Sequence, residues 1–317
     1  MSMRVLIVGA GAVGGYFGAR LAQAGRDITF LVRPGRAEVL RRDGLRITGT
    51  LGDFSVQPKL VSHPGALGGP YDVLFLSVKA YALAAAMDDL EPAMGPQSVI
   101  LPMLNGLAHV DVLTKRFGAQ RVIGGECRVS VQLDRNGAIR QLADFQQIRY
   151  GELNGSVTPR IRAVDDLMQG VGFDAAISEH IMQDMWEKWV QLAGLGATTC
   201  LLRGTIGDIV AVPGGAGITL AIIDECAAIA TVCGYPPSPA FIAANAAVMT
   251  KPGSPLASSM YRDLNVGSSV EVEQILGDLL ARAQSHRINA PLLEAATAAL
   301  RIYQNRITQA GAKLDKR

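Results

Sequence analysis

The first half of the chain alternates between uninterrupted apolar runs and stretches whose apolar residues recur every three or four positions. The first run, Arg4 to Val8, is aliphatic after its arginine and predicts a strand buried on both faces of a parallel sheet. It stops at Gly9, and apolar residues then follow one face of a helix that ends at Gly25. The chain therefore opens with a strand, a tight turn and a helix.

The same order of strand and helix recurs over the next hundred residues. One hairpin pattern, Leu45 to Val56 with its turn at Gly52-Asp53, interrupts this order and is expected to lie outside the sheet. Alternating strands and helices predict an α/β fold with a doubly wound parallel sheet of the Rossmann type. Its further strands are expected at Asp27 to Arg33, Tyr71 to Val78 and Ser98 to Leu104, with helices at 35–43, 82–90 and up to Phe117.

The pattern changes twice in the second half. Between Arg121 and Tyr150, three shorter strands predict an antiparallel extension of the sheet; they are RVIGGECRVSVQL, GAIRQL and QQIRYG. A helix over 156–170 and a strand over 173–177 follow, and after Ser178 only helical patterns remain. These helices are expected at 181–195, 214–233, 239–249, 270–285 and 291–310. The 317 residues are therefore predicted to form a Rossmann-type domain, 1–178, and an all-helical domain, 179–317.

The first turn carries glycines at the spacing G-x-G-x-x-G. Gly9 makes the sharp turn, Gly11 lets the backbone approach a pyrophosphate, and Gly14 lets the helix lie close to its strand. A strand before the motif and a helix after it are the context that this motif requires. We therefore expect a dinucleotide to bind at residues Gly9, Ala10, Gly11, Ala12, Val13 and Gly14.

The end of the second strand bears on which dinucleotide binds. A site for NAD usually has Asp or Glu there to bind the ribose 2′-hydroxyl, whereas Arg accommodates the 2′-phosphate of NADP. This chain has no acid at that point and has Arg33 and Arg36. The arginines could also be solvated charges at a helix start, but the missing carboxylate favours NADP, with Arg33 as its ligand.

Composition excludes several classes of function. A chain that is 49% hydrophobic and 18% charged folds into a buried core, and its net charge of +2, without a Lys/Arg block, argues against nucleic acid as a partner. The four cysteines show no C-x-x-C pair and the four histidines are scattered, so we expect no metal site. No secretory signal and no apolar run of roughly 18 residues occurs, which predicts a cytoplasmic protein without a membrane segment.

Two polar residues follow neighbouring strands of the predicted sheet. Lys79 comes after the strand that begins at Tyr71, and Asn105 comes after the next one. Ligands of doubly wound sheets lie beyond the carboxyl ends of the strands. Each residue alone could serve a cap or a turn, but together they indicate contact with cofactor and substrate.

With these residues in view, the chain resembles the ketopantoate reductase (2-dehydropantoate 2-reductase) family over nearly its whole length. The resemblance rests on G-A-G-A-V-G at the N-terminus, S-V-K-A at 77–80, L-N-G-L at 104–107, W-E-K at 186–188, and S-S-M-Y-R-D followed by V-E-V at 258–272. It implies reduction of a 2-oxo acid to a 2-hydroxy acid by NADPH, most simply of 2-dehydropantoate to pantoate in pantothenate biosynthesis.

The resemblance also implies roles for single residues. Lys188 would protonate the substrate carbonyl, Glu271 would contact the substrate and the nicotinamide, and Ser259 the substrate carboxylate. Asn105 would bind both substrate and cofactor, with Lys79 on the cofactor side. Plainer interpretations exist: Lys188 as a solvated helix residue beside two tryptophans, Glu271 as an acid favoured by a helix dipole, and Ser259 or its neighbour as an N-cap.

The sequence departs from the family at the positions that bind the substrate. The family has asparagines four and eight residues after the catalytic lysine, and this chain has Leu192 and Gly196; a further polar position falls near Ile206. A pocket without these amides cannot satisfy a hydroxylated substrate in the same way. A related reductase for a more apolar 2-oxo acid is therefore the alternative, and an NADP-binding sensor without activity, which retention of Lys188 and Glu271 argues against, is a third.

The apolar residues of helices 214–233 and 291–310 occupy more than one face. Such faces are expected either in a homodimer interface or in the core of the helical domain, and the sequence does not separate these alternatives.

Overall fold

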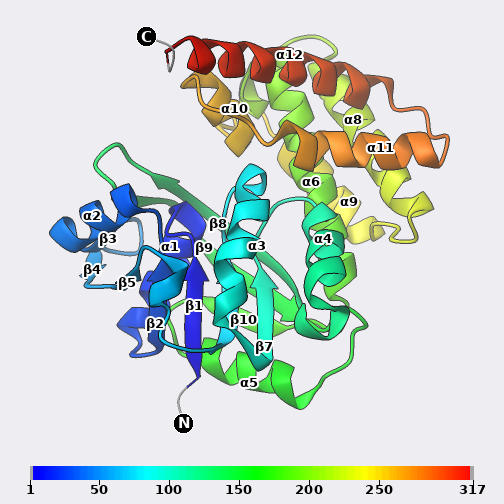
Figure 1. The fold of residues 1–317 in the computed structure, drawn as a ribbon. Coiled ribbons are helices and arrows are strands. Elements are labelled where there is room, and N and C mark those ends of the chain that lie inside the picture. The colour runs from blue at the N-terminus through cyan, green and yellow to red at the C-terminus, as the bar shows by residue number, and fades with distance from the viewer. Residues whose placement is uncertain (1–2, 315–317) are drawn as a thin grey trace. The chain divides into compact units, whose positions relative to one another are not determined.

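The computed structural model describes residues 3–314 (Figure 1). These described residues form two compact units, one within 1–104 and 109–184 and the other within 105–108 and 185–317. The units divide after Asp184, a few residues beyond the boundary expected at 178, and the short segment Asn105–Ala108 groups with the second unit. Asn105 is therefore part of the same unit as Lys188 and Glu271.

A parallel sheet forms the centre of the first unit. Its strands are β1 (Arg4–Val8), β2 (Asp27–Leu31), β5 (Lys59–Val61), β6 (Tyr71–Leu76) and β7 (Met94–Pro102), in the order β5-β2-β1-β6-β7. All four pairings are parallel, with Val5 of β1 opposite Ile28 on one side and Val73 on the other. Val5 and Ile7 contribute to one hydrophobic cluster, whereas Leu6 and Val8 contribute to another. The expected burial of β1 on both faces is thus confirmed.

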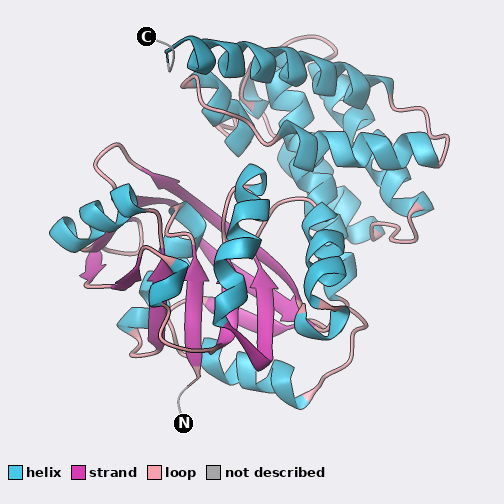
Figure 2. Cartoon of the chain, viewed as in Figure 1, coloured by secondary structure: helices cyan, strands magenta, loops and turns pink. Residues whose placement is uncertain are grey.

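Helices connect these strands in the doubly wound order. They are α1 (Ala12–Gln23), α2 (Pro34–Asp43), α3 (Leu83–Leu90) and α4 (Ala108–Phe117). Short 3₁₀ segments at 64–66, 80–82, 91–93 and 119–121 lie between the elements. The predicted α/β class with a parallel sheet is confirmed, and Figure 2 shows the magenta strands among the cyan helices.

A second sheet replaces the predicted extension of the first. Its strands are β3 (Leu45–Gly49), β4 (Phe54–Val56), β8 (Gly124–Leu133), β9 (Ile139–Gly151) and β10 (Asp174–Ile177), in the order β10-β9-β3-β4 with β8 paired to β9. The antiparallel pairing of β8 with β9 agrees with expectation, but the expectation that they extend the parallel sheet is wrong. GAIRQL and QQIRYG also form one strand, β9, rather than two.

Packing on α1 explains the separate sheet. Helix α1 contacts β1 and β2 of the parallel sheet and also β3, β4, β8 and β9 of the second sheet. Ile139 of β9 lies so close to Gly15 that a Cβ on this glycine would be 2.3 Å from its Cδ1. A single cluster therefore includes Ile7, Ile139 and Ile148, and α5 (Pro159–Met168) covers part of it. The second sheet buries its apolar face against α1, and it meets the first sheet through one parallel bridge between Ile100 of β7 and Val122, just before β8.

The second unit is helical, as predicted. Its helices are α6 (Ile181–Leu202), which begins in the first unit, α7 (Ile206–Val210), α8 (Gly215–Val232), α9 (Pro239–Met249), α10 (Ser259–Asn265), α11 (Asp278–Ser285) and α12 (Pro291–Leu314), with a π-helical turn at Glu273–Gly277 before α11. Helix α6 continues past its expected end at residue 195, through Gly194 and Gly196. Helix α8 is long and apolar enough to span a membrane by length and composition, a property that core helices of soluble proteins share.

Candidate functional site

Two glycines of the first turn are required by the packing of the protein itself. Gly9 has a φ of +97°, and a Cβ there would lie 2.6 Å from the carbonyl oxygen of Ser77. A Cβ on Gly14 would lie 2.3 Å from the carbonyl oxygen of Gly9 and 2.9 Å from Cβ of Ser77. The turn after β1 therefore lies tightly against the end of β6, as the roles expected for these two glycines require.

Gly11 differs from both. Its φ is −77°, and a Cβ there would meet no heavy atom within 4 Å. It is the N-cap of α1, whose first turn has no acidic residue and no side-chain cap. Backbone N–H groups at such a helix end attract phosphate. The open space over Gly11 thus fits the pyrophosphate of a dinucleotide.

A cavity of about 720 Å³ opens beside this turn. The segments that follow β1, β2 and β6 line it together with the end of β8. Five of the predicted cofactor residues are in its wall: Gly9, Ala10, Gly11, Arg33 and Lys79. Ala12, Val13 and Gly14 continue into α1 outside the wall. The sequence interpretation missed His63, Tyr81 and Leu133, which also line the cavity; none belongs to a motif, and Tyr81 stands out only as an exposed aromatic residue.

The wall of the cavity is rich in positive charge. Arg33, Arg36 and Lys79 line it, against one acidic residue, Asp89. The Arg33 side chain is exposed, and its guanidinium has no hydrogen-bond or ion-pair partner within residues 3–314. Helix α2 has no acidic residue in its first turn. This charge distribution suits an anionic ligand beyond the end of β2.

In the second unit, three predicted segments meet at Gly106. This glycine has a φ of +76°, and a Cβ there would lie 2.3 Å from the carbonyl oxygen of Gln274 and 3.9 Å from the indole nitrogen of Trp189. The same indole N–H donates a hydrogen bond of 2.9 Å to the carbonyl of Ile275. The loop of Asn105, the α6 turn of Lys188 and the helical turn that follows Glu271 are therefore packed together.

The predicted catalytic residues differ in burial. Lys188 is half-buried beside the buried Trp189, whereas Glu271 is only 4% exposed and directly precedes the first helical residue of its segment. The carbonyl of Ile275, which accepts the hydrogen bond from the indole of Trp189, lies within the π-helical turn that follows Glu271. Turns of this kind occur frequently at functional sites.

The serine pair at the start of α10 has divided roles. Ser258 is the N-cap: its hydroxyl accepts from the N–H of Tyr261 at 3.0 Å and lies 2.9 Å from the Thr199 hydroxyl. Ser259 is the first helical residue and is half-buried. The structural N-cap interpretation therefore applies to Ser258 and leaves Ser259 available as the predicted substrate residue.

Met260 explains one departure from the family pattern. A Cβ on Gly196 would lie 2.4 Å from Cε of Met260, a side chain that is 1% exposed. The methionine therefore fills the place where a larger residue at position 196 would project from α6. Together with Leu192, it makes the α6 face that follows Lys188 apolar.

None of the predicted residues of the second unit lines the cavity of the first. The structure groups Gly9, Ala10, Gly11, Arg33 and Lys79 there, and packs the segments of Asn105, Lys188 and Glu271 together in the second unit. Within the described part of the chain, no three His, Cys, Asp or Glu side chains are close enough to hold a metal ion.

Comparison with known proteins identifies the family. The model for ketopantoate reductase PanE/ApbA matches residues 5–155, and the model for its C-terminal part matches residues 180–304. The uncharacterized oxidoreductase YkpB of Bacillus subtilis is 36% identical over 302 residues, which are 95% of this chain and 99% of that protein. A 2-dehydropantoate 2-reductase of Mesorhizobium japonicum is 29% identical, over 72% of this chain and 76% of its own.

Solved structures agree with this assignment. The crystal structure of 2-dehydropantoate 2-reductase from Geobacter metallireducens is 26% identical, with a TM-score of 0.86 over 94% of this chain and 99% of that one. A structure of D-mandelate dehydrogenase with NADH and anilino(oxo)acetate has the same fold, with a TM-score of 0.87 at 19% identity over 96% of this chain and 100% of that one. The chain belongs to the ketopantoate reductase family.

Proposed function

We propose that this oxidoreductase uses NADPH to reduce the keto group of a 2-oxo acid, with 2-dehydropantoate as its first candidate substrate and pantoate as the product. The observation that carries the proposal is the packing of the Asn105 loop, the Lys188 turn and the Glu271 segment around Gly106. These are the segments to which the family resemblance assigns substrate binding and proton transfer. Such a reaction belongs to cytoplasmic pantothenate biosynthesis.

The proposed chemistry needs a proton and a hydride. When bound, NADPH supplies the hydride that the keto carbon accepts. Lys188 donates a proton to the carbonyl oxygen, where negative charge develops. Ser259 binds the substrate carboxylate, and Asn105 and Glu271 orient the substrate beside Lys188. The products are a 2-hydroxy acid and NADP⁺.

Preference for NADPH over NADH is proposed from the cavity. Arg33 lies at the end of the loop that follows β2. Its guanidinium has no hydrogen-bond or ion-pair partner among the described residues, and this loop has no carboxylate that could bind a ribose 2′-hydroxyl. A guanidinium forms charge-assisted hydrogen bonds with phosphate oxygens. Arg33→Gln is expected to raise the Kd for NADPH about tenfold or more while affecting NADH little.

A second candidate substrate is a 2-oxo acid with an apolar side chain. Met260 fills the space beside Gly196, and Leu192 lies one turn closer to Lys188. A substrate hydroxyl that faces these side chains finds no hydrogen-bond partner from them, at a cost of about 1–3 kcal/mol. The apolar α6 face therefore favours this candidate over 2-dehydropantoate at this one position.

Turnover by the purified full chain tests both candidates. NADPH absorbance is followed on adding 2-dehydropantoate, and separately 2-oxo acids with aliphatic or aromatic side chains. Lys188→Ala is the control and is expected to lower kcat about 10²- to 10⁴-fold. Turnover of 2-dehydropantoate supports the first candidate, and preference for an apolar acid the second. NADPH binding without any turnover would instead indicate a cofactor-binding sensor. A homodimer, one of the two alternatives for the apolar faces of helices 214–233 and 291–310, stays a prediction.

A further inference from the structure

The end of β8, just before the turn that leads to β9, forms part of the cavity proposed for the cofactor. Leu133, the last residue of β8, lines the cavity wall. The turn that follows is closed by Asp134, whose Oδ1 accepts from the N–H of Asn136 at 2.8 Å and from that of Ala138 at 2.9 Å. Gly137 supplies the positive φ of +78° that the turn requires. This hairpin tip, residues 133–138, is therefore a compact unit, and its position sets where Leu133 lies in the cavity wall.

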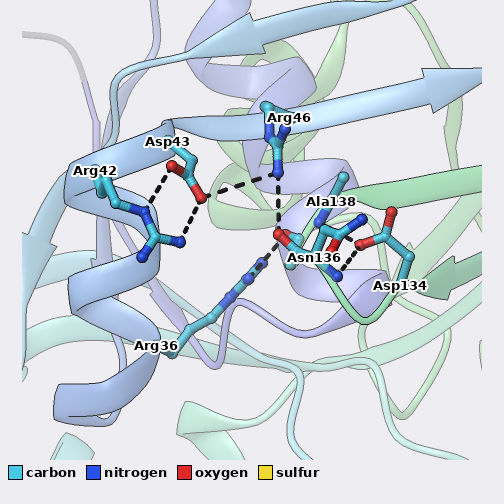
Figure 3. Close-up of polar contacts among 8 residues, drawn as sticks. Arg36, Arg42, Asp43, Arg46, Asp134, Asn136 and Ala138 are labelled. Atoms are coloured by element: carbon cyan, nitrogen blue, oxygen red, sulfur yellow. Dashed lines mark hydrogen bonds and ion pairs between the residues drawn. The ribbon is translucent and has the colours of Figure 1, made fainter.

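Two arginines from other elements hold the hairpin tip (Figure 3). Arg36 of α2 donates from Nη1 to the carbonyl of Gly137 at 2.8 Å, and Arg46 of β3 donates from Nη2 to the carbonyl of Asn136 at 3.0 Å. Arg36 also donates from Nε to the carbonyl of Ala10 at 3.1 Å. One guanidinium thus connects the middle of the glycine-rich turn to the hairpin tip.

The positive charge of Arg36 has no ion-pair partner in the described part of the chain. Both of its hydrogen bonds go to neutral carbonyls, and its third nitrogen, Nη2, is buried without a partner there. Burial lowers the pKa of Arg36, and the nearby charge of Asp134 opposes this shift. Because a guanidinium stays protonated, a fixed positive charge lies in a partly desolvated place at the cavity wall.

Arg42 on the same helix provides the contrast. Its side chain is 72% exposed and forms two hydrogen bonds of 2.8 Å with the carboxylate of Asp43. It does not line the cavity. Arg42 forms a surface ion pair, whereas Arg36 is directed inward and makes no ion pair with the described residues, although the charge of Asp134 lies nearby.

We propose that Arg36 is a positioning residue of the cofactor site, which holds the glycine-rich turn and the hairpin tip together and whose charge favours the dinucleotide that carries an additional phosphate. The proposal rests on the proposed function in one respect, that the ligand of this cavity is NADPH. Arg33 is the direct phosphate ligand in this arrangement. Arg36 acts through Ala10, through Gly137 and through its field, because its free nitrogen is buried.

Direct binding of each cofactor to the full chain, without substrate, tests the proposal. Kd values for NADPH and NADH are measured by calorimetric titration at low and moderate salt. Arg36→Gln is expected to raise the Kd for NADPH about tenfold and that for NADH by less than about threefold, with a weaker salt dependence for NADPH. Arg42→Gln removes a charge from the same helix and is expected to leave both Kd values within about twofold.

The Gly137→Ala variant separates the effect of the hairpin tip's position from the effect of the Arg36 charge. Its Cβ would lie 2.9 Å from Nη1 of Arg36 and 2.7 Å from Cγ1 of Val39, and its φ of +78° is strained for alanine. The hairpin tip or these side chains must therefore shift, while both arginines remain in the chain. We expect both cofactors to bind more weakly by a similar factor, with their ratio unchanged. Arg36→Lys keeps the positive charge but lacks the planar guanidinium group. It should therefore preserve more of the ratio of the NADH Kd to the NADPH Kd than Arg36→Gln does.

The outcomes distinguish the two proposals. If the unmodified chain binds NADPH and Arg36→Gln leaves the ratio of the two Kd values unchanged, the role of Arg36 is refuted while the proposed function stands. If the unmodified chain binds neither cofactor, both fail. Should Arg36→Gln not fold, as judged by its thermal transition, Arg36→Lys and Gly137→Ala decide by the same ratio.

Discussion

A single methyl group at Gly11 is expected to separate cofactor binding from folding. A Cβ there meets no heavy atom within 4 Å, and a φ of −77° is ordinary for alanine. Alanine is a poorer N-cap than glycine, but it also restricts the unfolded chain; these effects oppose each other at about 0.5–1 kcal/mol each. Gly11→Ala should therefore fold with nearly unchanged stability.

The same methyl group stands where a phosphate must approach the N-terminus of α1. Loss of one hydrogen bond to a charged group, about 1.5–3 kcal/mol, raises the Kd for NADPH about ten- to hundredfold. At a concentration 100 times its Kd, NADPH stabilises the unmodified protein by about 2.7 kcal/mol. With a hundredfold weaker Kd, the variant gains only about 0.4 kcal/mol at that concentration.

Thermal unfolding with and without NADPH, beside a direct titration, measures both effects. Gly14→Ala is the matched control, because its Cβ would lie 2.3 Å from the Gly9 carbonyl oxygen and should lower Tm even without ligand. Binding of NADPH to Gly11→Ala as tight as to the unmodified protein would refute this prediction. Unfolding of the ligand-free Gly11→Ala variant as early as Gly14→Ala would refute it equally.

Three further predictions concern packing and pH. Gly196→Asn should lose about 1–3 kcal/mol of stability to overpacking against Met260, and Met260→Ala in the same chain should restore part of it, as urea unfolding of the single and double variants would show. Ser258→Ala should lose about 1 kcal/mol in the same assay through its N-cap, with the Kd for NADPH unchanged. Burial raises the pKa of Glu152, but hydrogen bonds from Arg160 and Thr158 outweigh it and leave the pKa below its ordinary value. Its stabilisation is therefore present at neutral pH and lost as pH falls through the folded-state pKa, so Glu152→Gln should destabilise at pH 7 and much less in acid; an equal loss at both would contradict this.

The glycine-rich turn, and the strand and helix that flank it, could be predicted because their signal is local. Gly9, Gly11 and Gly14 lie within six residues, and the strand and helix around them are visible as apolar patterns. Arg33 follows directly from the end of the second strand. Leu133 and the contacts of Arg36 could not be predicted, because the hairpin tip is about a hundred residues from α2 in the chain, and nothing local indicates that they pair.

The substrate side shows the same division. Leu192 and Gly196 are visible as departures at fixed spacing from Lys188, and they already indicate an apolar surface. That Met260 fills the place beside Gly196, and that the hydroxyl of Ser258 meets that of Thr199, depends on how α10 packs against α6. These contacts join residues about sixty positions apart in the chain, so no local pattern in the sequence indicates them.

By itself, the sequence determined the order of strands and helices, the parallel sheet, the helical second half and the family, since periodicity and short motifs depend on neighbours along the chain. Only the tertiary structure decided that β8 and β9 form part of a second sheet that packs on α1. It also decided that Asn105 belongs to the same unit as Lys188 and Glu271, and that Arg36 hydrogen-bonds both to Ala10 and to the hairpin tip. Strands with the same alternating pattern can pair with either sheet. The choice between them depends on which apolar surface is left uncovered, and that surface exists only once α1 has packed.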